Sequence, residues 1–367
     1  MSIYPELRPS PAYFSYLPKE PRPILLIGAG GIVRDAHLPA YKKAGFPVWG
    51  IVNRTESRAR ELAEQFGIQH VYQSLQQAVS EAPINTVFDL ALMPEQYVET
   101  LMALPDNSAV LIQKPLGHNL EQAKELLEIC RRKNLTAAVN TQLRFAPYIE
   151  KARKLMATGQ LGKIFDFEIK ISVNTPWELF PHVFGLDRLE INMHSVHYLD
   201  LARSIFGEPD SISAVTVHHP LKTEIATTRS TQILRYRSRD LRVIIDTNHD
   251  NSFGTKYQDS YIQIQGTSGS IRIKMGLLLN YPIGEDDSFE IFLNDEKSLD
   301  WQTLQLEGSW FPDAFIGSMG SLQSYLDGTV GELPTSVEDV IHTMELVESA
   351  YTSNDSEGIN LKAEEKR

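Results

Sequence analysis

One lysine in this sequence occupies a position from which it could do chemistry. Lys114 follows the apolar run 109–113 and precedes Pro115. Proline restricts the residue before it to an extended conformation, so the ammonium can be aimed at a bound molecule. There it would stabilise negative charge or hold a proton. An exposed lysine on a turn is the alternative for this residue taken alone.

Two histidines and an aspartate recur at three-residue spacing further along the chain. His194, His197 and Asp200 lie in a run that resembles a largely buried helix ending at Gly207. This spacing predicts that the three side chains lie along one side of the helix. Imidazole exchanges protons near neutral pH, so the segment could supply a general base. A hydrogen-bonded core network is an equal alternative.

A glycine-rich turn follows the first strongly apolar run, residues 24–27. Gly28 permits a tight turn, and Gly30 lets the backbone approach a pyrophosphate at a helix N-terminus. With Gly31 and Ile32 these are the expected cofactor-binding residues of this turn. The third glycine of the dinucleotide fingerprint is absent, so a plain strand–turn–helix connection stays open as an alternative.

The end of the next apolar run, 47–53, is where a ribose-binding residue belongs. An NAD site usually carries a carboxylate there, but this chain has Asn53, Arg54 and, one helical turn later, Arg58. An amide and two guanidinium groups suit a 2′-phosphate, so the sequence favours NADP, with NAD possible. The alternative is that both arginines belong to the solvated face of a helix starting near Thr55.

Further pocket candidates follow from their place in the chain. Trp177 and His182 lie in a loop, 174–182, that follows a long predicted strand and could close over a site. With Arg144, Asn192 and His194 they are the expected substrate-binding residues.

Composition limits the class of protein. The formal net charge of −12 (35 basic against 47 acidic residues) disfavours binding to nucleic acid or to an anionic membrane surface. We therefore expect a small-molecule substrate and a homodimer or homotetramer as partners. The single cysteine, Cys130, excludes an intrachain disulfide and a cysteine-based zinc site. With no signal-peptide pattern at the start, it indicates a cytoplasmic protein.

Hydrophobic periodicity predicts an α/β protein with two domains after a proline-rich arm, residues 1–22. Residues 23–143 alternate between buried strands and amphipathic helices, which is typical of a doubly wound parallel sheet, a Rossmann domain. Residues 144–367 are expected to form an α+β domain with a large, mostly antiparallel sheet. The expected N-terminal strands are 23–28, 47–53, 86–91, 109–113 and 135–140, and the helices are 31–44, 55–66, 74–81, 94–104 and 119–133, the last with Asn119 as its N-cap.

The C-terminal half is expected to begin with a helix near 147–158 that ends at Gly159. Long strands rich in β-branched and aromatic residues follow. They are 163–173, 211–218, 230–236, 241–249, 261–265 and 270–274, with a hairpin loop at 266–269.

The ordered set of motifs resembles the Gfo/Idh/MocA oxidoreductases, relatives of glucose-fructose oxidoreductase and inositol dehydrogenase. The resemblance covers residues 22 to about 362. It is carried by the glycine turn with His37-Leu38-Pro39-Ala40, by Gln113-Lys114-Pro115, by Arg144-Phe145 with 159–163, by Ser195-Val196-His197-Tyr198-Leu199-Asp200 and by Asp313-Ala314-Phe315. It implies NAD(P)-dependent oxidation or reduction of sugar or polyol carbons.

The resemblance also implies site residues. Lys114 matches the active-site lysine of the family and His197 its active-site histidine, and Lys114 is also expected among the cofactor-binding residues. Gln113 stands where a glutamate is usual, and Met193 where an aspartate is usual. The usual lysine–aspartate–histidine arrangement is therefore incomplete, and His194 or Asn192 would have to replace the polar contact.

The implied mechanism is hydride transfer between a nicotinamide and a carbinol or carbonyl carbon of a sugar-like substrate. His197 would take the hydroxyl proton, while Lys114 hydrogen-bonds the same oxygen. Two other functions stay open: a non-catalytic dinucleotide-binding sensor, and an enzyme of the glycosidase type that uses NAD as a transient oxidant. A metal site at His182, His194 and Asp200 is disfavoured, so we expect no metal.

Overall fold

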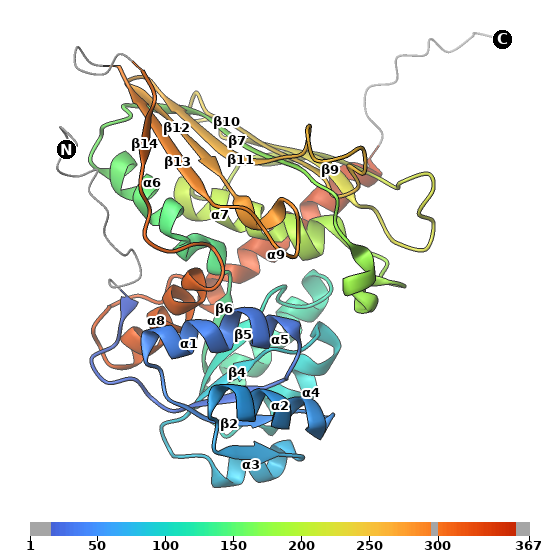
Figure 1. Cartoon of the computed structure of the whole chain (residues 1–367), viewed down its shortest axis with the longest axis vertical. Helices are drawn as coiled ribbons and strands as arrows, with labels where there is room; N and C mark the ends of the chain where they lie inside the picture. Colours follow the sequence, from blue (N-terminus) through green and yellow to red (C-terminus); the bar gives the residue numbers. More distant parts are fainter. Residues whose placement is uncertain (1–15, 295–299, 357–367) are drawn as a thin grey trace.

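The protein consists of two sheets with helices packed on and between them. The computed structural model describes residues 16–294 and 300–356. In Figure 1 the six-stranded N-terminal sheet occupies the lower half and the eight-stranded C-terminal sheet the upper half. Of the predicted arm, residues 1–15 lie outside the described residues.

The N-terminal sheet is parallel throughout, with the strand order β3-β2-β1-β4-β5-β6. This is the order of a dinucleotide-binding domain, and it confirms the predicted Rossmann fold. One strand was not predicted, because three residues at the sheet edge are too short to show a periodicity. The strands are β1 (Ile24–Ile27), β2 (Val48–Val52), β3 (His70–Tyr72), β4 (Val87–Leu90), β5 (Ala109–Gln113) and β6 (Thr136–Asn140).

Alternate residues of β1 enter two different cores, because successive side chains of a strand point to opposite faces. Leu25 packs with the side of the sheet that α4 and α5 cover, whereas Leu26 packs with the side that α1 and α2 cover. The Asn119 side chain accepts a hydrogen bond from Gln122 N at 2.9 Å, which confirms the predicted cap of α5. The helices are α1 (Leu38–Ala44), α2 (Glu56–Phe66), α3 (Leu75–Glu81), α4 (Tyr97–Ala103) and α5 (Leu120–Arg132).

The C-terminal sheet has the order β14-β13-β12-β11-β7-β10-β9-β8. Only β7 and β10 pair in parallel among its described strands, so the expected mostly antiparallel sheet is confirmed. Gly266 pairs with Gly269 across the predicted hairpin. The strands are β7 (Ile164–Ser172), β8 (Ser211–Val217), β9 (Arg229–Arg235), β10 (Arg242–Asn248), β11 (Asp259–Gly266), β12 (Gly269–Lys274), β13 (Ser288–Leu293) and β14 (Gln302–Leu304).

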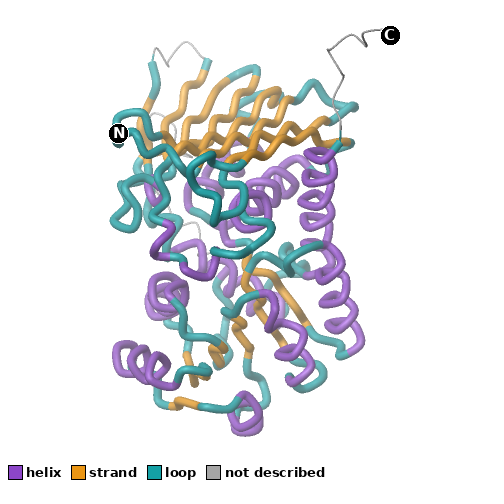
Figure 2. The backbone as a smooth tube through the Cα atoms, turned by 90° about the vertical axis from the view of Figure 1, so that its right-hand side faces the viewer, coloured by secondary structure: helices purple, strands orange, loops and turns teal. Residues whose placement is uncertain are grey.

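Helices cover one face of this sheet and leave the other without helices (Figure 2). The covering helices lie between the two sheets in Figure 1 and include α6 (Pro147–Ala157), α7 (Val196–Phe206) and α9 (Val337–Asp355). Along β7, Phe167, Ile169 and Ile171 are fully buried, while Glu168 and Lys170 between them are not. The sheet therefore presents a polar and partly apolar outer face.

Helix α8 (Asp313–Leu326) comes late in the chain but packs on the N-terminal domain. It contacts α1 and β6, and Phe315 and Met319 belong to the same core as Leu26. Neither α8, α9, β13 nor β14 was predicted. In α8 the reason is burial on nearly all sides, which removes the polar stripe that marks an amphipathic helix.

Two predicted helices begin with a π-helical turn. Residues Val33–His37 form such a turn before α1, and Glu190–Ser195 form another before α7. The helix expected at 31–44 is confirmed, since these residues are helical throughout, with the π-helical turn at Val33–His37 inside the helix. A π-turn adds a residue per turn and changes which side chains share a face; such turns occur frequently at functional sites.

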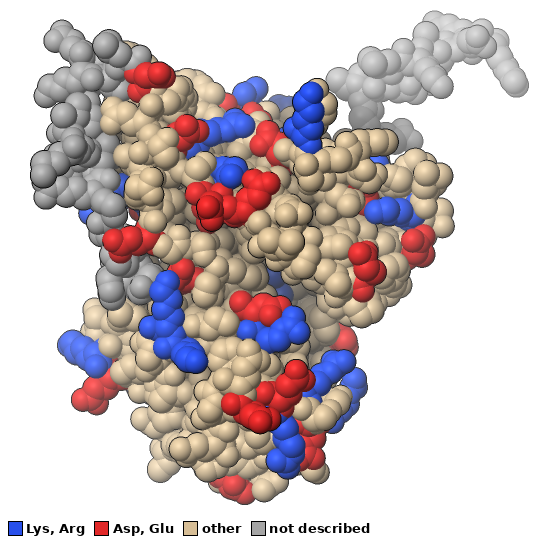
Figure 3. Space-filling view, viewed as in Figure 1, with Lys and Arg blue, Asp and Glu red and all other residues tan. Residues whose placement is uncertain are grey.

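The described residues of the arm are hydrogen-bonded to the C-terminal end of α8. The backbone N–H groups of Lys19 and Arg22 donate to the Asp327 and Gln323 side chains, both at 2.7 Å. Acidic and basic side chains are interspersed on the face shown in Figure 3. Within 16–294 and 300–356, no helix is long and apolar enough to cross a membrane.

Candidate functional site

The glycine turn is tightly packed at Gly28 and open at Gly30. Gly28 has a φ of +118°, and a Cβ atom placed on it would lie 2.3 Å from the carbonyl oxygen of Ala91. A Cβ on Gly30 would meet nothing within 4 Å. The first N–H groups of the following helical segment, from Gly31 and Ile32, have no intrahelical acceptor by position. A pyrophosphate fits this arrangement of open backbone and helix N-terminus.

A cavity of about 360 Å³ continues from this turn along the ends of β1 and β2. Arg54 and Arg58 both line it, are exposed, and make no ion pair with any described residue. The Asn53 amide accepts from Ala29 N at 3.2 Å and donates to the Thr55 carbonyl at 2.9 Å. Asn53 therefore fixes the turn, while the two guanidinium groups are available to an anionic ligand.

Lys114 lies directly after β5, at the carboxyl edge of the parallel sheet. Its Nζ donates to the main-chain oxygen of Met193 at 2.8 Å, which joins the two domains at this point. Burial disfavours the charged ammonium and lowers the pKa of Lys114 to about 8. The Met193 side chain packs toward the apolar cluster around Trp177, so the carbonyl of this residue, not its side chain, meets the lysine.

Three histidines gather around this ammonium. Burial is the main cause that lowers the pKa of His182, His194 and His197, and the positive charge of Lys114 lowers each one further. The hydrogen bond from Lys114 to Met193 O places the ammonium on the segment that continues with His194 and His197. Neutral imidazoles beside one ammonium can accept a proton from a substrate.

His249 joins this group, although the sequence analysis did not select it. It follows β10 and packs against His194 with 4.4 Å between ring centroids and the rings tilted by 31°. Trp177 packs against both rings and donates through Nε1 to Asp250 at 2.9 Å. Trp177 is 4% exposed, so it is a buried support for the histidine pair. In the sequence, one feature could have identified His249, which is its position as a polar residue at the end of a predicted strand.

A chain of buried hydrogen bonds runs beneath Lys114. Asn140 Nδ2 donates to Gln113 Oε1 at 2.8 Å and lies 3.4 Å from the Nε2 atom of His37. The Nδ1 atom of His37 lies 2.7 Å from Asp89 Oδ2, which also accepts from the Tyr41 hydroxyl at 2.7 Å. The side chain that stands in place of the family's glutamate is therefore oriented by an amide and a buried imidazole–carboxylate pair.

Arg144 and Asp200 are not part of this group. The Arg144 guanidinium donates to both Asp200 oxygens and to Asp339 at 2.5–2.6 Å, and it also donates to the Pro334 carbonyl. Thr343 donates to Asp200 as well. Asp200 therefore belongs to a buried hydrogen-bonded network, the alternative that the sequence left open for this segment. The four contacts of Arg144 tie η5 (Gln142–Phe145) to α7, to α9 and to the segment before α9.

His197 and Asn192 keep unpaired atoms. His197 is 8% exposed, packs edge-on against Trp310 at 5.7 Å, and has no hydrogen bond at Nδ1. Asn192 is 1% exposed, and its Oδ1 has no partner among the described residues. Buried polar atoms without partners are costly, so both side chains are candidates for contact with a ligand.

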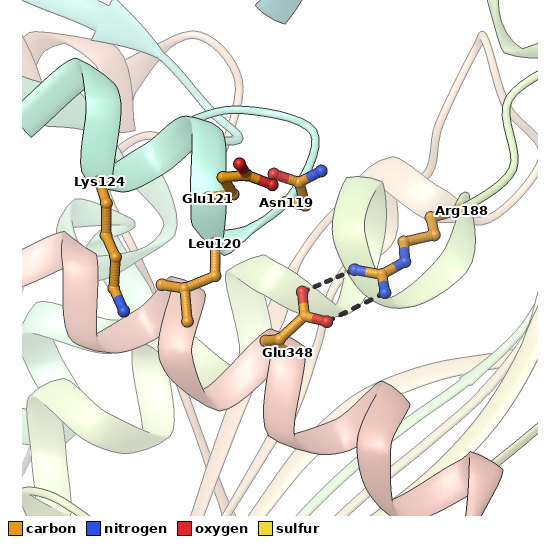
Figure 4. A pocket seen from close by; sticks show the side chains of 6 residues that line it. All are labelled: Asn119, Leu120, Glu121, Lys124, Arg188 and Glu348. Carbon is orange, nitrogen blue, oxygen red and sulfur yellow. Dashed lines mark hydrogen bonds and ion pairs between the residues drawn. The ribbon is translucent and has the colours of Figure 1, made fainter.

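A second cavity, of about 420 Å³, lies between α5, α9 and the segment before α7 (Figure 4). Arg188 and Glu348 face each other there and form two hydrogen bonds of 2.6 and 3.0 Å, so their charges are compensated. No predicted site residue lines this cavity. In the described part of the chain, no cluster of three or more histidine, cysteine or acidic residues could hold a metal ion.

Two family models match the chain. Residues 22–141 match "Oxidoreductase family, NAD-binding Rossmann fold", and residues 153–361 match "Oxidoreductase family, C-terminal alpha/beta domain", both of the Gfo/Idh/MocA group. Together they cover most of the chain.

Individual relatives are similar at low identity over most of their length. D-apiose dehydrogenase of Paraburkholderia graminis is 22% identical over 89% of this chain and 86% of its own. The 1,5-anhydro-D-fructose reductase of Ensifer adhaerens is 26% identical over 71% and 77%. Among solved structures, a levoglucosan dehydrogenase complex with NADH and levoglucosan has a TM-score of 0.75 at 18% identity, over 91% of this chain and 97% of that one. An Agrobacterium radiobacter oxidoreductase complex with NAD+, L-tartaric acid and magnesium has a TM-score of 0.74 at 21% identity, over 91% and 96%.

Proposed function

Because this chain belongs to the Gfo/Idh/MocA family of oxidoreductases, we propose that it transfers a hydride between a nicotinamide and a CH–OH carbon of a sugar or polyol. One observation carries this proposal. Lys114 directly follows β5 at the carboxyl edge of the parallel sheet and donates to Met193 O, on the segment that carries His194 and His197. Open α/β sheets bind their ligands at that edge.

The dinucleotide would lie along the glycine turn and the cavity that continues from it. Gly28, Gly30, Gly31 and Ile32 would contact the pyrophosphate through the backbone. When bound, the nicotinamide supplies the hydride acceptor or donor. We propose NADP over NAD, because Arg54 and Arg58 line the cavity without ion pairs and no carboxylate follows β2 where a ribose would be bound.

Two side chains would manage the proton of the reacting hydroxyl. His197 is buried and neutral at physiological pH, so its free ring nitrogen can accept a proton during oxidation. The Lys114 ammonium would hydrogen-bond the same oxygen and stabilise the negative charge that develops on it. In reduction, the same groups would return the proton. His182, His194, Asn192 and Trp177 would form or support the substrate pocket.

The experiment is a screen of purified protein against neutral aldoses, ketoses and inositols and against sugar acids, followed by nicotinamide absorbance at 340 nm with NADP and NAD in parallel. We expect turnover on at least one sugar or polyol and tighter binding of NADPH than of NADH by calorimetry. Dinucleotide binding without turnover on any substrate class would favour a sensor. Release of a sugar product with no net change in nicotinamide absorbance would favour the glycosidase-type cycle.

We also propose that the chain assembles as a homodimer or homotetramer through the outer face of the C-terminal sheet. Val215, Val217 and Ile233 are exposed on that face, which carries no helices (Figure 2). Closed symmetric assemblies commonly bury such a face. Light scattering at micromolar concentration tests this, and a monomeric mass would contradict it.

A further inference from the structure

The strongest unexplained feature near Lys114 is a pair of packed histidine rings with unpaired nitrogens. His194 Nδ1 and His249 Nε2 are shielded from solvent and have no hydrogen-bond partner among the described residues. A buried polar atom without a partner costs about 1–3 kcal/mol. Two such atoms on rings 4.4 Å apart indicate that a ligand supplies the missing hydrogen bonds.

The surroundings hold the pair in place. The other ring nitrogen of His249, Nδ1, lies 3.1 Å from the Thr175 hydroxyl, which leaves Nε2 as the free atom. Trp177 packs 5.8 Å from His194 and 6.1 Å from His249, and Asp250 fixes its indole N–H. Rings held by packing and hydrogen bonds lose little freedom when a ligand binds, which favours a recognition site.

The charge of this region is nearly compensated without a ligand. Burial lowers the pKa of both histidines, to about 4 for His249, so both rings are neutral at physiological pH. The Lys222 ammonium binds Asp250, which also accepts a hydrogen bond from the Thr228 hydroxyl. The Lys114 ammonium, whose charge burial disfavours, is occupied by its hydrogen bond to the Met193 carbonyl.

We infer that His194 and His249 form a specificity subsite that hydrogen-bonds two neighbouring hydroxyls of an uncharged sugar or polyol, next to the carbon that reacts. The inference rests on the proposed function and narrows its substrate class. A neutral imidazole offers either a donor or an acceptor, as hydroxyl groups require. A sugar acid or sugar phosphate would place a negative charge beside two neutral imidazoles, where Lys222 is already paired with Asp250 and Lys114 with the Met193 carbonyl, and would bind less tightly.

The first arm of the test compares each active neutral sugar or polyol with its acid or phosphate derivative. We expect kcat/KM to be at least about tenfold higher for the neutral compound. A higher value for the charged derivative would overturn the inference and leave the proposed oxidoreductase function intact. No turnover on any compound would overturn the proposed function, and the inference with it.

The second arm uses His249→Leu, His249→Asn and the control His342→Leu, an exposed histidine of α9 paired with Glu345. We expect His249→Leu to raise KM for the neutral substrate about tenfold to a hundredfold with kcat little changed, and His249→Asn to restore part of that loss. Dinucleotide affinity and the melting temperature of His249→Asn should stay near those of the wild type.

Deoxy analogues of the substrate separate recognition from structural support. If His249 binds one hydroxyl, the analogue lacking that hydroxyl binds the wild type weakly and loses nothing further in His249→Leu. An equal loss for every analogue would mean that His249 only supports the fold, and would overturn the inference. A fall in kcat at constant KM would overturn it as well.

Discussion

Lys114 Nζ donates a 2.8 Å hydrogen bond to the main-chain oxygen of Met193, at the position where the family resemblance places an aspartate. This hydrogen bond joins the lysine to the helical segment that carries His197, but its acceptor is a neutral carbonyl and not a carboxylate. No carboxylate from position 113 or 193 offsets the desolvation of the ammonium, and its pKa falls to about 8. The two departures from the family pattern thus act on one quantity, the proton affinity of Lys114.

Replacing Lys114 with methionine tests its contact with the reacting oxygen. We expect turnover to fall about a hundredfold or more, since an electrostatic contact to developing charge is lost. The dissociation constant of the dinucleotide should change little, because the cavity at Arg54 and the glycine turn lies apart from the ammonium. Steady-state kinetics and calorimetry measure the two effects, and wild-type turnover in both Lys114→Met and His197→Ala would falsify the assigned roles.

The rate of oxidation should show a bell-shaped dependence on pH. His197 must be neutral to accept a proton, and its pKa is lowered, so the acid limb should lie below pH 6.5. Lys114 must be protonated to stabilise negative charge, so the rate should fall as the pH rises through about 8. Profiles of kcat/KM over pH 5–10 check this, and an alkaline limb that persists unchanged in Lys114→Met would assign it to another group.

Gln113→Glu should move the alkaline limb to higher pH. The Asn140 amide can still donate to a carboxylate oxygen at this position, so the side chain should keep its orientation. A negative charge beside the ammonium favours the protonated lysine, and we expect a shift of about one pH unit or more. Gln113→Met, which removes the hydrogen bond without adding charge, is the control. An alkaline limb of the pH–rate profile that stays near pH 8 in Gln113→Glu would show that residue 113 does not change the pKa of Lys114.

Arg54→Ala should narrow the preference for NADP. Losing a charge-assisted contact to the 2′-phosphate should weaken NADPH binding by about 1.5–3 kcal/mol and leave NADH binding nearly unchanged. Arg60→Ala is the control, since Arg60 lies on α2, just after the turn that carries Arg54, but pairs with Glu56 and does not line the cavity. Calorimetry that finds tighter NADH binding in the wild type would contradict the assignment.

Arg144→Met should destabilise the fold and spare substrate binding. It removes the partner of Asp200, which is 1% exposed, and an unpaired buried carboxylate lowers the free energy of unfolding by about 3 kcal/mol or more. The exposed pair of Arg60 and Glu56 should contribute under about 1 kcal/mol, so Arg60→Met serves as a comparison. Thermal melting and KM are the measurements. A large rise in KM with an unchanged melting temperature would show that Arg144 binds substrate.

The sequence by itself determined the features that depend on residues close together along the chain. Gly28 is required by a positive φ and by the close approach of Ala91, and the alternation of buried strands and helices follows from local periodicity. The position of Lys114 at a sheet edge follows from its place after an apolar strand. Each of these is a local backbone property, which the order of side chains along the chain controls.

Only the tertiary structure decided which distant side chains meet. The contact of His249 with His194, the pairing of Arg144 with Asp200 and the packing of α8 on the N-terminal sheet all join segments that are far apart in the sequence. His194 and Asp200, from one helical segment, likewise meet different distant partners, His249 and Arg144. Such contacts arise from the packing of whole elements against one another, and no local pattern of residue types specifies that packing.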